Sequence, residues 1–312
     1  MLGDPFDTHS PEAKAIGALF DQTLIVCGAI LLVVTTLVVV CIVRFRAKAG
    51  VKEDPVQHHG NTRLEIAWTI APFLVLVWLF WLTVKTVMAS DPPPDRAPDL
   101  TVIAHQWWWE ARYATGAVTA NEIHIPVGRK LLVEIRSADV IHDFWVPQLA
   151  RKVDATPGRS TFIWLEADAS GTYLGACAEY CGTQHAWMRI MVVAEPEAEF
   201  VAWEAHEREP AAPTTGDAAA RGARLFADMT CVKCHGIATG QPSDAALPHV
   251  APDLTHIARR RTLAAGRLDN NHANLAAWLK DPQALKQGSH MPSLQLTDAK
   301  VDDLTAYFES LK

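Results

Sequence analysis

Two long apolar runs near the start of this 312-residue chain restrict its fold more than any other feature. Thr23–Val43 and Ile66–Val84 contain no charged side chain. Each has close to the length of about 20 apolar residues that an α-helix needs to cross a bilayer. Pro72 lies inside the second run, which a membrane helix tolerates where neighbours satisfy the freed carbonyl. The sequence therefore predicts a two-helix transmembrane hairpin with spans at 23–43 and 66–88.

The basic residues of this region cluster between the two runs, beginning at Arg44. Short loops rich in Lys and Arg stay in the cytoplasm, so the loop 44–65 is predicted to be cytoplasmic. The N-terminal segment 1–22 and everything beyond the second span would then lie on the periplasmic side of a bacterial inner membrane. The chain begins without a basic n-region, so the first run is expected to be a retained span rather than a signal peptide.

Beyond the second span, the sequence changes to short alternating segments. Residues 89–98 are rich in proline and predict a stiff linker. Strands of alternating apolar and polar residues follow, separated by turn residues, near 100–113, 121–126, 130–137, 139–146, 160–167, 171–176 and 187–194. Such a series of short strands predicts a β-sandwich or β-barrel over 99–195.

A cluster of soft metal donors lies toward the end of this β region. Residues 177–188 read C-A-E-Y-C-G-T-Q-H-A-W-M, and a further His lies at position 142. Thiols, imidazoles and a thioether together suit copper. A single blue-copper ion needs one Cys, so the second thiolate suggests two bridged copper ions, each capped by one His. The candidate ligands are His142, Cys177, the backbone carbonyl of Glu179, Cys181, His185 and Met188.

Two other interpretations of the cluster remain open from the residues alone. A disulfide would use the two Cys and leave His185 and Met188 without a role. A zinc ion would take Cys and His but has little use for a thioether.

The pattern C-A-E-Y-C-G-x-x-H-x-x-M resembles the binuclear copper (CuA) loop of cytochrome c oxidase subunit II. This resemblance implies a cupredoxin fold and two copper ions. It also implies that Trp107, in H-Q-W-W-W, is the surface point where electrons enter, and that Glu65 stands at the entrance of a proton pathway into subunit I. From the residues alone, an interfacial acid without a role is the preferred interpretation of Glu65. In one continuous strand, Trp107 and Trp109 would face one side and Trp108 the other.

A second cofactor motif follows a predicted linker at 196–216, in which the charged stretch 195–209 is expected to form a short helix. Cys231, Cys234 and His235 form C-x-x-C-H, the signature of covalent haem c attachment, in which the His becomes an iron ligand. Met291 is the only Met after this motif, and His–Met ligation is the pairing of cytochromes c. The rival ligands are His249, His256, His272 and His290.

The segment 217–312 resembles a class I cytochrome c, an all-α fold whose first and last helices cross. The resemblance implies that Gly222 and Phe226 on the first helix meet Leu304 and Tyr307 on the last helix. It also implies that the carbonyl of Pro252 holds the ring of the haem-ligating histidine.

The two motifs and the two spans together define the predicted function. The chain resembles a caa-type oxidase subunit II with a fused C-terminal cytochrome c, in which electrons pass through haem c and copper to subunit I. Expected partners are subunit I, subunit III, the membrane, and an external cytochrome c or an upstream respiratory complex as donor. The net charge of −7 is too mild to suggest nucleic acid, and the run Arg259–Arg261 is predicted to be a solvated face.

Two other functional interpretations remain at this point. The same copper module would serve the copper-bearing subunit of a membrane nitric oxide reductase. The chain would alternatively be a non-enzymatic redox module that acts alone, although a covalent haem and Glu65 fit that interpretation poorly.

Overall fold

The computed structural model describes the chain except for residues 1, 47–49, 51–56, 58–59, 93–95 and 241–249. Parts of the predicted cytoplasmic loop and of the proline-rich linker, and the rival ligand His249, therefore lie outside the described residues. The chain divides into two compact units. One unit is Lys14–Ser90, and the other joins Met1–Ala13 to Asp91–Lys312.

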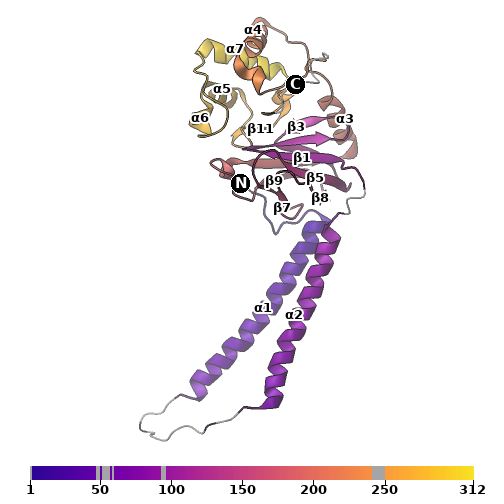
Figure 1. Ribbon diagram of the computed structural model, residues 1–312, viewed down its shortest axis with the longest axis vertical. Helices are drawn as coiled ribbons and strands as arrows, with labels where there is room; N and C mark the ends of the chain where they lie inside the picture. Colours follow the sequence, from indigo (N-terminus) through magenta and orange to yellow (C-terminus); the bar gives the residue numbers. More distant parts are fainter. Residues whose placement is uncertain (1, 47–49, 51–56, 58–59, 93–95, 241–249) are drawn as a thin grey trace. The chain divides into compact units, whose positions relative to one another are not determined.

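The first unit consists of most of α1 (Pro11–Arg44) and of α2 (Thr62–Ser90), and both helices extend beyond the predicted spans at each end (Figure 1). The side-chain oxygen of Asn61 caps α2 by accepting the backbone N–H groups of Arg63 and Leu64 at 3.1 and 3.3 Å. The most apolar window of each helix has no buried residue, and both helices are long and apolar enough to cross a membrane. A helix that is apolar all round requires an apolar surrounding such as lipid.

The second unit contains a β domain built from two five-stranded sheets (Figure 1). The first sheet has the order β3 (Val118–Ala120), β2 (Trp108–Tyr113), β1 (Leu100–His105), β5 (Leu131–Ser137) and β8 (Thr161–Leu165). The second has the order β4 (Glu122–Pro126), β10 (Arg189–Glu195), β9 (Gly171–Cys177), β6 (His142–Trp145) and β7 (Val153–Ala155). Two pairs, β1–β5 and β4–β10, are parallel, and the other pairs within these sheets are antiparallel.

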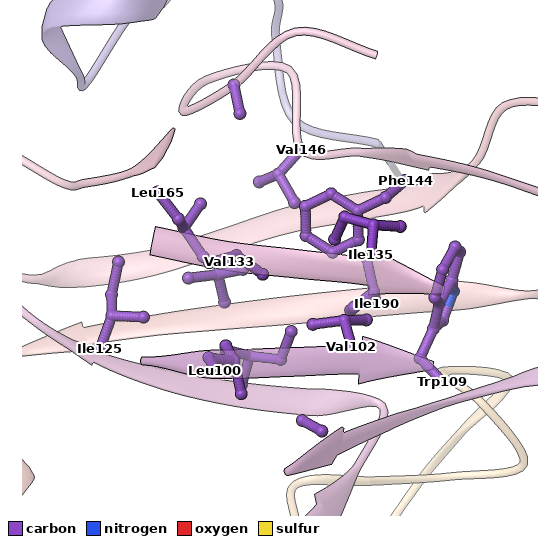
Figure 2. Packing of buried hydrophobic residues seen from close by; sticks show 14 of the residues in the cluster. Leu100, Val102, Trp109, Ile125, Val133, Ile135, Phe144, Val146, Leu165 and Ile190 are labelled. Carbon is purple, nitrogen blue, oxygen red and sulfur yellow. The ribbon is translucent and has the colours of Figure 1, made fainter. Parts of the chain in front are cut away.

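The core of the β domain lies between the two sheets (Figure 2). Alternate residues of β1 point inward, so Leu100 and Val102 are fully buried while their neighbours are half-buried. From the other sheet, Phe144 meets Trp109 edge-on, with ring centroids 5.7 Å apart at 88°. The prediction of a β-sandwich with alternating strands is therefore confirmed.

The predicted single strand at 100–113 is instead a hairpin of β1 and β2, with Gln106 and Trp107 at its turn. No Gly, Pro or Asn marks this turn in the sequence. Tertiary contacts hold it, because Asp139 accepts the backbone N–H of Gln106 at 2.6 Å. Trp109 lies in the sandwich core, and Trp108 lies in a separate buried cluster with Ala120 and Ala265. The short strands β3 and β7 were not predicted, because three residues give too little alternation to recognise.

The short helix expected in the charged stretch 195–209 is confirmed as α3 (Glu197–Glu207), but it does not belong to a linker. Its Phe200 and Trp203 are buried in the core of the β domain. Trp203 stacks on the ring of His124, with centroids 4.1 Å apart at an angle of 6°. The β domain therefore continues through α3, because this helix supplies part of its core.

The described residues of the C-terminal helical domain form four α-helices: α4 (Asp217–Asp228), α5 (His272–Lys280), α6 (Pro282–Leu285) and α7 (Asp298–Ser310). Short elements join them: η2 (Thr230–Lys233), η4 (Ile257–Arg259), β11 (Thr262–Leu263) and β12 (Leu268–Asp269). A Cβ atom at Gly222 of α4 would lie 2.7 Å from Tyr307 Cβ of α7, and the ring centroids of Phe226 and Tyr307 are 6.1 Å apart. The predicted crossing of the first and last helices is confirmed.

Candidate functional site

Three neighbouring strands of the second sheet bring the candidate copper ligands together. His142 begins β6, Cys177 ends β9, and Met188 immediately precedes β10. The backbone N–H of Cys177 donates to the carbonyl of Met188 at 2.9 Å, which fixes the two ends of the Cys177–Met188 loop beside each other. Strand β6 pairs with β9 so that Phe144 lies opposite Cys177.

The six predicted donors include two thiol sulfur atoms, and the other four donors each lie within 3.9 Å of one of them. Cys177 Sγ and Cys181 Sγ are 3.7 Å apart, and both side chains are buried. Cys177 Sγ lies 3.9 Å from His142 Nδ1 and 3.1 Å from the Glu179 carbonyl oxygen. Cys181 Sγ lies 3.6 Å from His185 Nδ1 and 3.8 Å from Met188 Sδ. A disulfide would require about 2.05 Å between the sulfurs. Six donors also exceed the four that a structural zinc ion takes.

An acid outside the donor set orients one imidazole. His142 Nε2 lies 2.8 Å from the Asp139 carboxylate, so Nε2–H donates there and Nδ1 keeps its lone pair for a metal. Burial raises the pKa of Asp139, but hydrogen bonds from His142 and from two backbone N–H groups outweigh it and lower the pKa below its ordinary value. The same carboxylate holds the Gln106 turn, so it couples the hairpin to the ligand.

The two thiols perturb each other's pKa. A hydrogen bond with Cys181, opposed by burial, lowers the pKa of Cys177 to about 3. The hydrogen bond with Cys177 and burial raise the pKa of Cys181 well above its ordinary value. A buried pair of thiols suits a soft cation, which binds the deprotonated form.

Trp107 lies directly beside this cluster but not on the surface. Its indole N–H donates to the carbonyl of Cys181 at 2.9 Å, and the side-chain amide of Gln106 donates to the same oxygen at 2.8 Å. Trp107 is 8% exposed, because His290 of the helical domain packs on its ring with centroids 4.9 Å apart. The expectation of a surface position is therefore corrected. Glu65 is exposed in the first turn of α2 and does not belong to the cluster.

The C-x-x-C-H motif forms a tight turn that presents its histidine. The backbone N–H groups of Cys234 and His235 both donate to the carbonyl of Cys231, at 3.1 and 2.9 Å. His235 Nδ1 lies 2.7 Å from the Pro252 carbonyl, so Nδ1–H donates and Nε2 is left for iron. The predicted contact with Pro252 is confirmed. Burial lowers the pKa of His235, which keeps the imidazole neutral.

Three of the rival iron ligands are engaged elsewhere. Both ring nitrogens of His256 face backbone carbonyls, at 3.1 and 3.0 Å, while His272 pairs with Glu309 and His290 packs on Trp107. Met291 is half-buried against the helical core, and the side-chain amide of Gln283 donates to its carbonyl at 2.7 Å. Met291 therefore stays the predicted partner for His235.

The prediction that Arg259–Arg261 is a solvated face is wrong for the middle residue, Arg260. Arg260 is 9% exposed, and its Nε and Nη2 have no hydrogen-bond partner among the described residues. Its charge also lowers the pKa of His235, which places it near the proposed iron ligand. Two buried guanidinium nitrogens without a hydrogen-bond partner in the described part of the chain fit a carboxylate of a bound haem. No signal in the sequence separates Arg260 from its two basic neighbours.

A β-sandwich with a two-thiolate donor cluster, a helical domain with C-x-x-C-H and two long apolar helices define a membrane-anchored electron-transfer protein of cupredoxin type. Residues 6–84 match the family described as cytochrome C oxidase subunit II, transmembrane domain, and residues 115–195 match its periplasmic domain. Residues 219–312 match the cytochrome c family. The chain belongs to the cytochrome c oxidase subunit II family, with a cytochrome c domain at its C-terminus.

Two bacterial relatives agree with this assignment over nearly the whole chain. Cytochrome c oxidase subunit 2 of Alkalihalophilus pseudofirmus is 38% identical over 98% of this chain and 90% of its own length. The corresponding subunit of Bacillus subtilis is 30% identical over 99% of this chain and 93% of its own length. The crystal structure of the periplasmic domain of subunit II from Bradyrhizobium japonicum is 30% identical, with a TM-score of 0.34, over 36% of this chain and 96% of that domain.

The family assignment confirms the predicted function. The protein is the subunit through which electrons enter a cytochrome c oxidase, and it works with subunit I of a haem-copper oxidase complex. The subunit II domain implies copper, and the cytochrome c domain implies haem c. The protein is a membrane protein with periplasmic domains.

Proposed function

We propose that electrons pass from an external donor to haem c in the helical domain, then to a binuclear copper centre in the β domain, and then to subunit I. The observation that carries this proposal is the arrangement of four candidate donors within 3.9 Å of one or the other of the two buried thiol sulfur atoms. Oxygen is then reduced in subunit I, coupled to proton translocation.

The copper ligands fall into strong bridging donors and weaker capping donors. Cys177 and Cys181 would bridge two copper ions, with His142 on one ion and His185 on the other. Met188 would bind copper weakly, and the Glu179 carbonyl would complete the donor set. Bound in this way, copper supplies a one-electron carrier whose charge is shared by two ions. The sheet fixes three of these residues, which limits how far the donors move when the electron arrives.

The haem ligands come from three separate parts of the helical domain. Cys231 and Cys234 would each bond covalently to a haem vinyl group, and His235 and Met291 would ligate the iron. Arg260 would pair with a haem carboxylate, which would satisfy its two unpartnered nitrogens.

The proposed setting is a bacterial inner membrane, with the loop 44–65 in the cytoplasm. Arg44 ends α1 and begins the basic cluster that supports this orientation. The proposed partners are subunits I and III and, as donor, an external cytochrome c or an upstream respiratory complex. Glu65, in the first turn of α2, would then stand at the cytoplasmic entrance of a proton pathway in subunit I.

Removing one bridging thiolate tests the copper proposal. Cys181→Ser replaces a soft sulfur by a hard oxygen and is expected to abolish the mixed-valence two-copper signal in electron paramagnetic resonance. Cys41→Ser is the matched control, because Cys41 lies exposed on α1, outside the cluster. A mixed-valence signal that survives in Cys181→Ser would show that the ligand assignment is wrong.

A further inference from the structure

Lys286 is a buried lysine that joins the helical domain to the β domain. It follows α6 directly, and it is 5% exposed. Its Nζ donates to the carbonyls of Trp107 and Trp187 in the β domain and of Ala264 in the helical domain, each at 3.0 Å. An ammonium group has three N–H donors, and here each donor has an acceptor. Two of the three hydrogen bonds therefore cross the boundary between the domains.

Burial opposes the charge of this group and lowers the pKa of Lys286 to about 7. The three carbonyl acceptors favour the ammonium form, because a neutral amine has two N–H groups and would leave one carbonyl unpaired. Removing the side-chain nitrogen would leave all three carbonyls without this donor, which is costly for buried polar groups.

Directional contacts elsewhere fix the same arrangement of the two domains. The backbone N–H of Arg189 donates to the Ala265 carbonyl at 3.1 Å, and the backbone N–H of Arg261 donates to the Glu122 carboxylate at 2.9 Å. A Cβ atom at Gly266 would lie 2.7 Å from Arg189 Cβ, so the backbones approach closely at this point. Backbone hydrogen bonds at separate points permit one relative position and no sliding.

The boundary also carries a continuous path between the proposed cofactor ligands. His290 is bonded to Met291 through one peptide, and its ring packs on Trp107 with centroids 4.9 Å apart. The Trp107 indole N–H donates to the Cys181 carbonyl at 2.9 Å. Bonded or packed atoms therefore lead from the proposed iron ligand Met291 to the proposed copper ligand Cys181.

We propose that the helical domain is held on the β domain in this one position and that the hydrogen bonds of Lys286 stabilise it there. In this position, His290 passes the electron to Trp107. This inference rests on the proposed function and deepens it. One electron leaves ferrous haem, which becomes ferric, and the same electron reduces the oxidised copper pair; no bond forms and no proton moves. Because the ring of His290 covers the ring of Trp107, an outside donor cannot contact Trp107. Such a donor therefore reduces the haem and does not pass electrons to copper through Trp107.

Hydrogen exchange of the whole chain, in the purified oxidase, tests the fixed position without using activity. The backbone amides of Arg189 and Arg261 are the reporters, because each donates across the boundary. In Lys286→Met, their exchange is expected to be about tenfold faster or more, the change expected when a charge-assisted hydrogen bond is lost. Lys300→Met is the control, because Lys300 is exposed on α7. Equal exchange in both variants would overturn the role of Lys286.

A pair of glycines offers a second test that keeps Lys286 intact. Gly266 and Gly216 both have positive φ, +76° and +90°, so alanine strains the backbone at both. A Cβ at Gly216 would meet nothing within 4 Å, whereas at Gly266 it would press on Arg189. Gly266→Ala is therefore expected to speed exchange at Arg189, and Gly216→Ala is not. Unchanged exchange in Gly266→Ala would refute the close approach of the domains.

Flash photoreduction of the haem, followed at the copper band, tests the path itself. His290→Ala is expected to slow haem-to-copper transfer severalfold with both metal spectra unchanged, and His272→Ala, a substitution of an exposed His on α5, is expected to leave the rate unchanged. Equal rates in the two variants would remove His290 from the path.

The wild-type rate separates this inference from the proposed function. A rate that rises with protein concentration would show transfer between molecules and would refute the proposed function. A rate that is independent of concentration but falls with solvent viscosity, or with Gly-Ser inserts in Pro210–Gly216, would retain the proposed function and refute the fixed position. We expect a transfer rate that does not change with protein concentration, with solvent viscosity or with Gly-Ser inserts in Pro210–Gly216.

Discussion

The crossing of α4 and α7 makes Gly222→Ala a demanding test of the helical domain. In an exposed helix, replacing Gly by Ala stabilises by about 1 kcal/mol, because Ala has the higher helix propensity. At Gly222, the added Cβ would clash with the backbone carbonyl of Asp303 and lie 2.7 Å from Tyr307 Cβ. Helix propensity and packing therefore predict opposite signs for the same substitution.

The packing effect is expected to be the larger one. Overpacking a core costs about 1–3 kcal/mol, and a clash with backbone belongs at the upper end, since a carbonyl cannot rotate away as a side chain can. Subtracting the propensity gain of about 1 kcal/mol leaves a net loss of about 2 kcal/mol. For a domain of this size, 1 kcal/mol corresponds to about 4–8 °C in Tm, so a decrease of about 8–16 °C is expected.

Thermal unfolding of the helical domain, followed by circular dichroism in the haem Soret band, measures this effect in the full chain. The Soret signal reports the haem surroundings alone, which matters because a chain of several domains does not unfold in one step. Gly28→Ala is the control, because Gly28 lies in α1 and a Cβ there would meet nothing within 4 Å. A Tm for Gly222→Ala equal to or above that of the wild type would refute the reasoning, because it would show that the helices do not touch at Gly222.

Three further predictions concern copper, topology and pH. Met188→Leu is expected to retain copper but shift its potential, since a weak axial ligand is lost; loss of the two-copper signal would contradict this. Protease added to intact spheroplasts is expected to cleave near Pro210–Gly216, and cleavage at Val51–His59 instead would invert the topology. Burial opposes the charge of His124, but hydrogen bonds to Glu122 and Glu195 raise its pKa. The contribution of His124 to the free energy of unfolding is therefore fully present below pH 6.5 and is lost as the pH rises through the pKa of His124 in the folded protein. Urea unfolding should show this decline in the wild type but not in His124→Gln.

Much of the protein follows from short-range features of the sequence. A bilayer demands runs of apolar residues, so α1 and α2 can be recognised by composition. Metal and haem sites demand donors that one loop brings together, so Cys177–Met188 and Cys231–His235 each identify a cofactor without tertiary information. Alternation of period two indicated most strands of the β domain, because half-buried strands require it.

Long-range contacts decided the features that the sequence did not reveal. Lys286 stands in the polar stretch D-P-Q-A-L-K-Q-G and has no local sign of burial; its carbonyl partners Trp107 and Trp187 lie far away in the chain. The turn at Gln106 lacks turn-forming residues. It is stabilised instead by Asp139, in the connection between β5 and β6, which accepts the backbone N–H of Gln106.

The sequence by itself determined which cofactors this protein carries, because ligand chemistry is set by residue type and short spacing. The tertiary structure alone decided how the two cofactor domains meet. Arg260 is buried while Arg259 and Arg261 remain accessible, and Trp107 lies under His290 rather than on the surface. The physical reason is that burial and hydrogen bonding depend on which distant segments pack together, and no single residue type or local period records that choice.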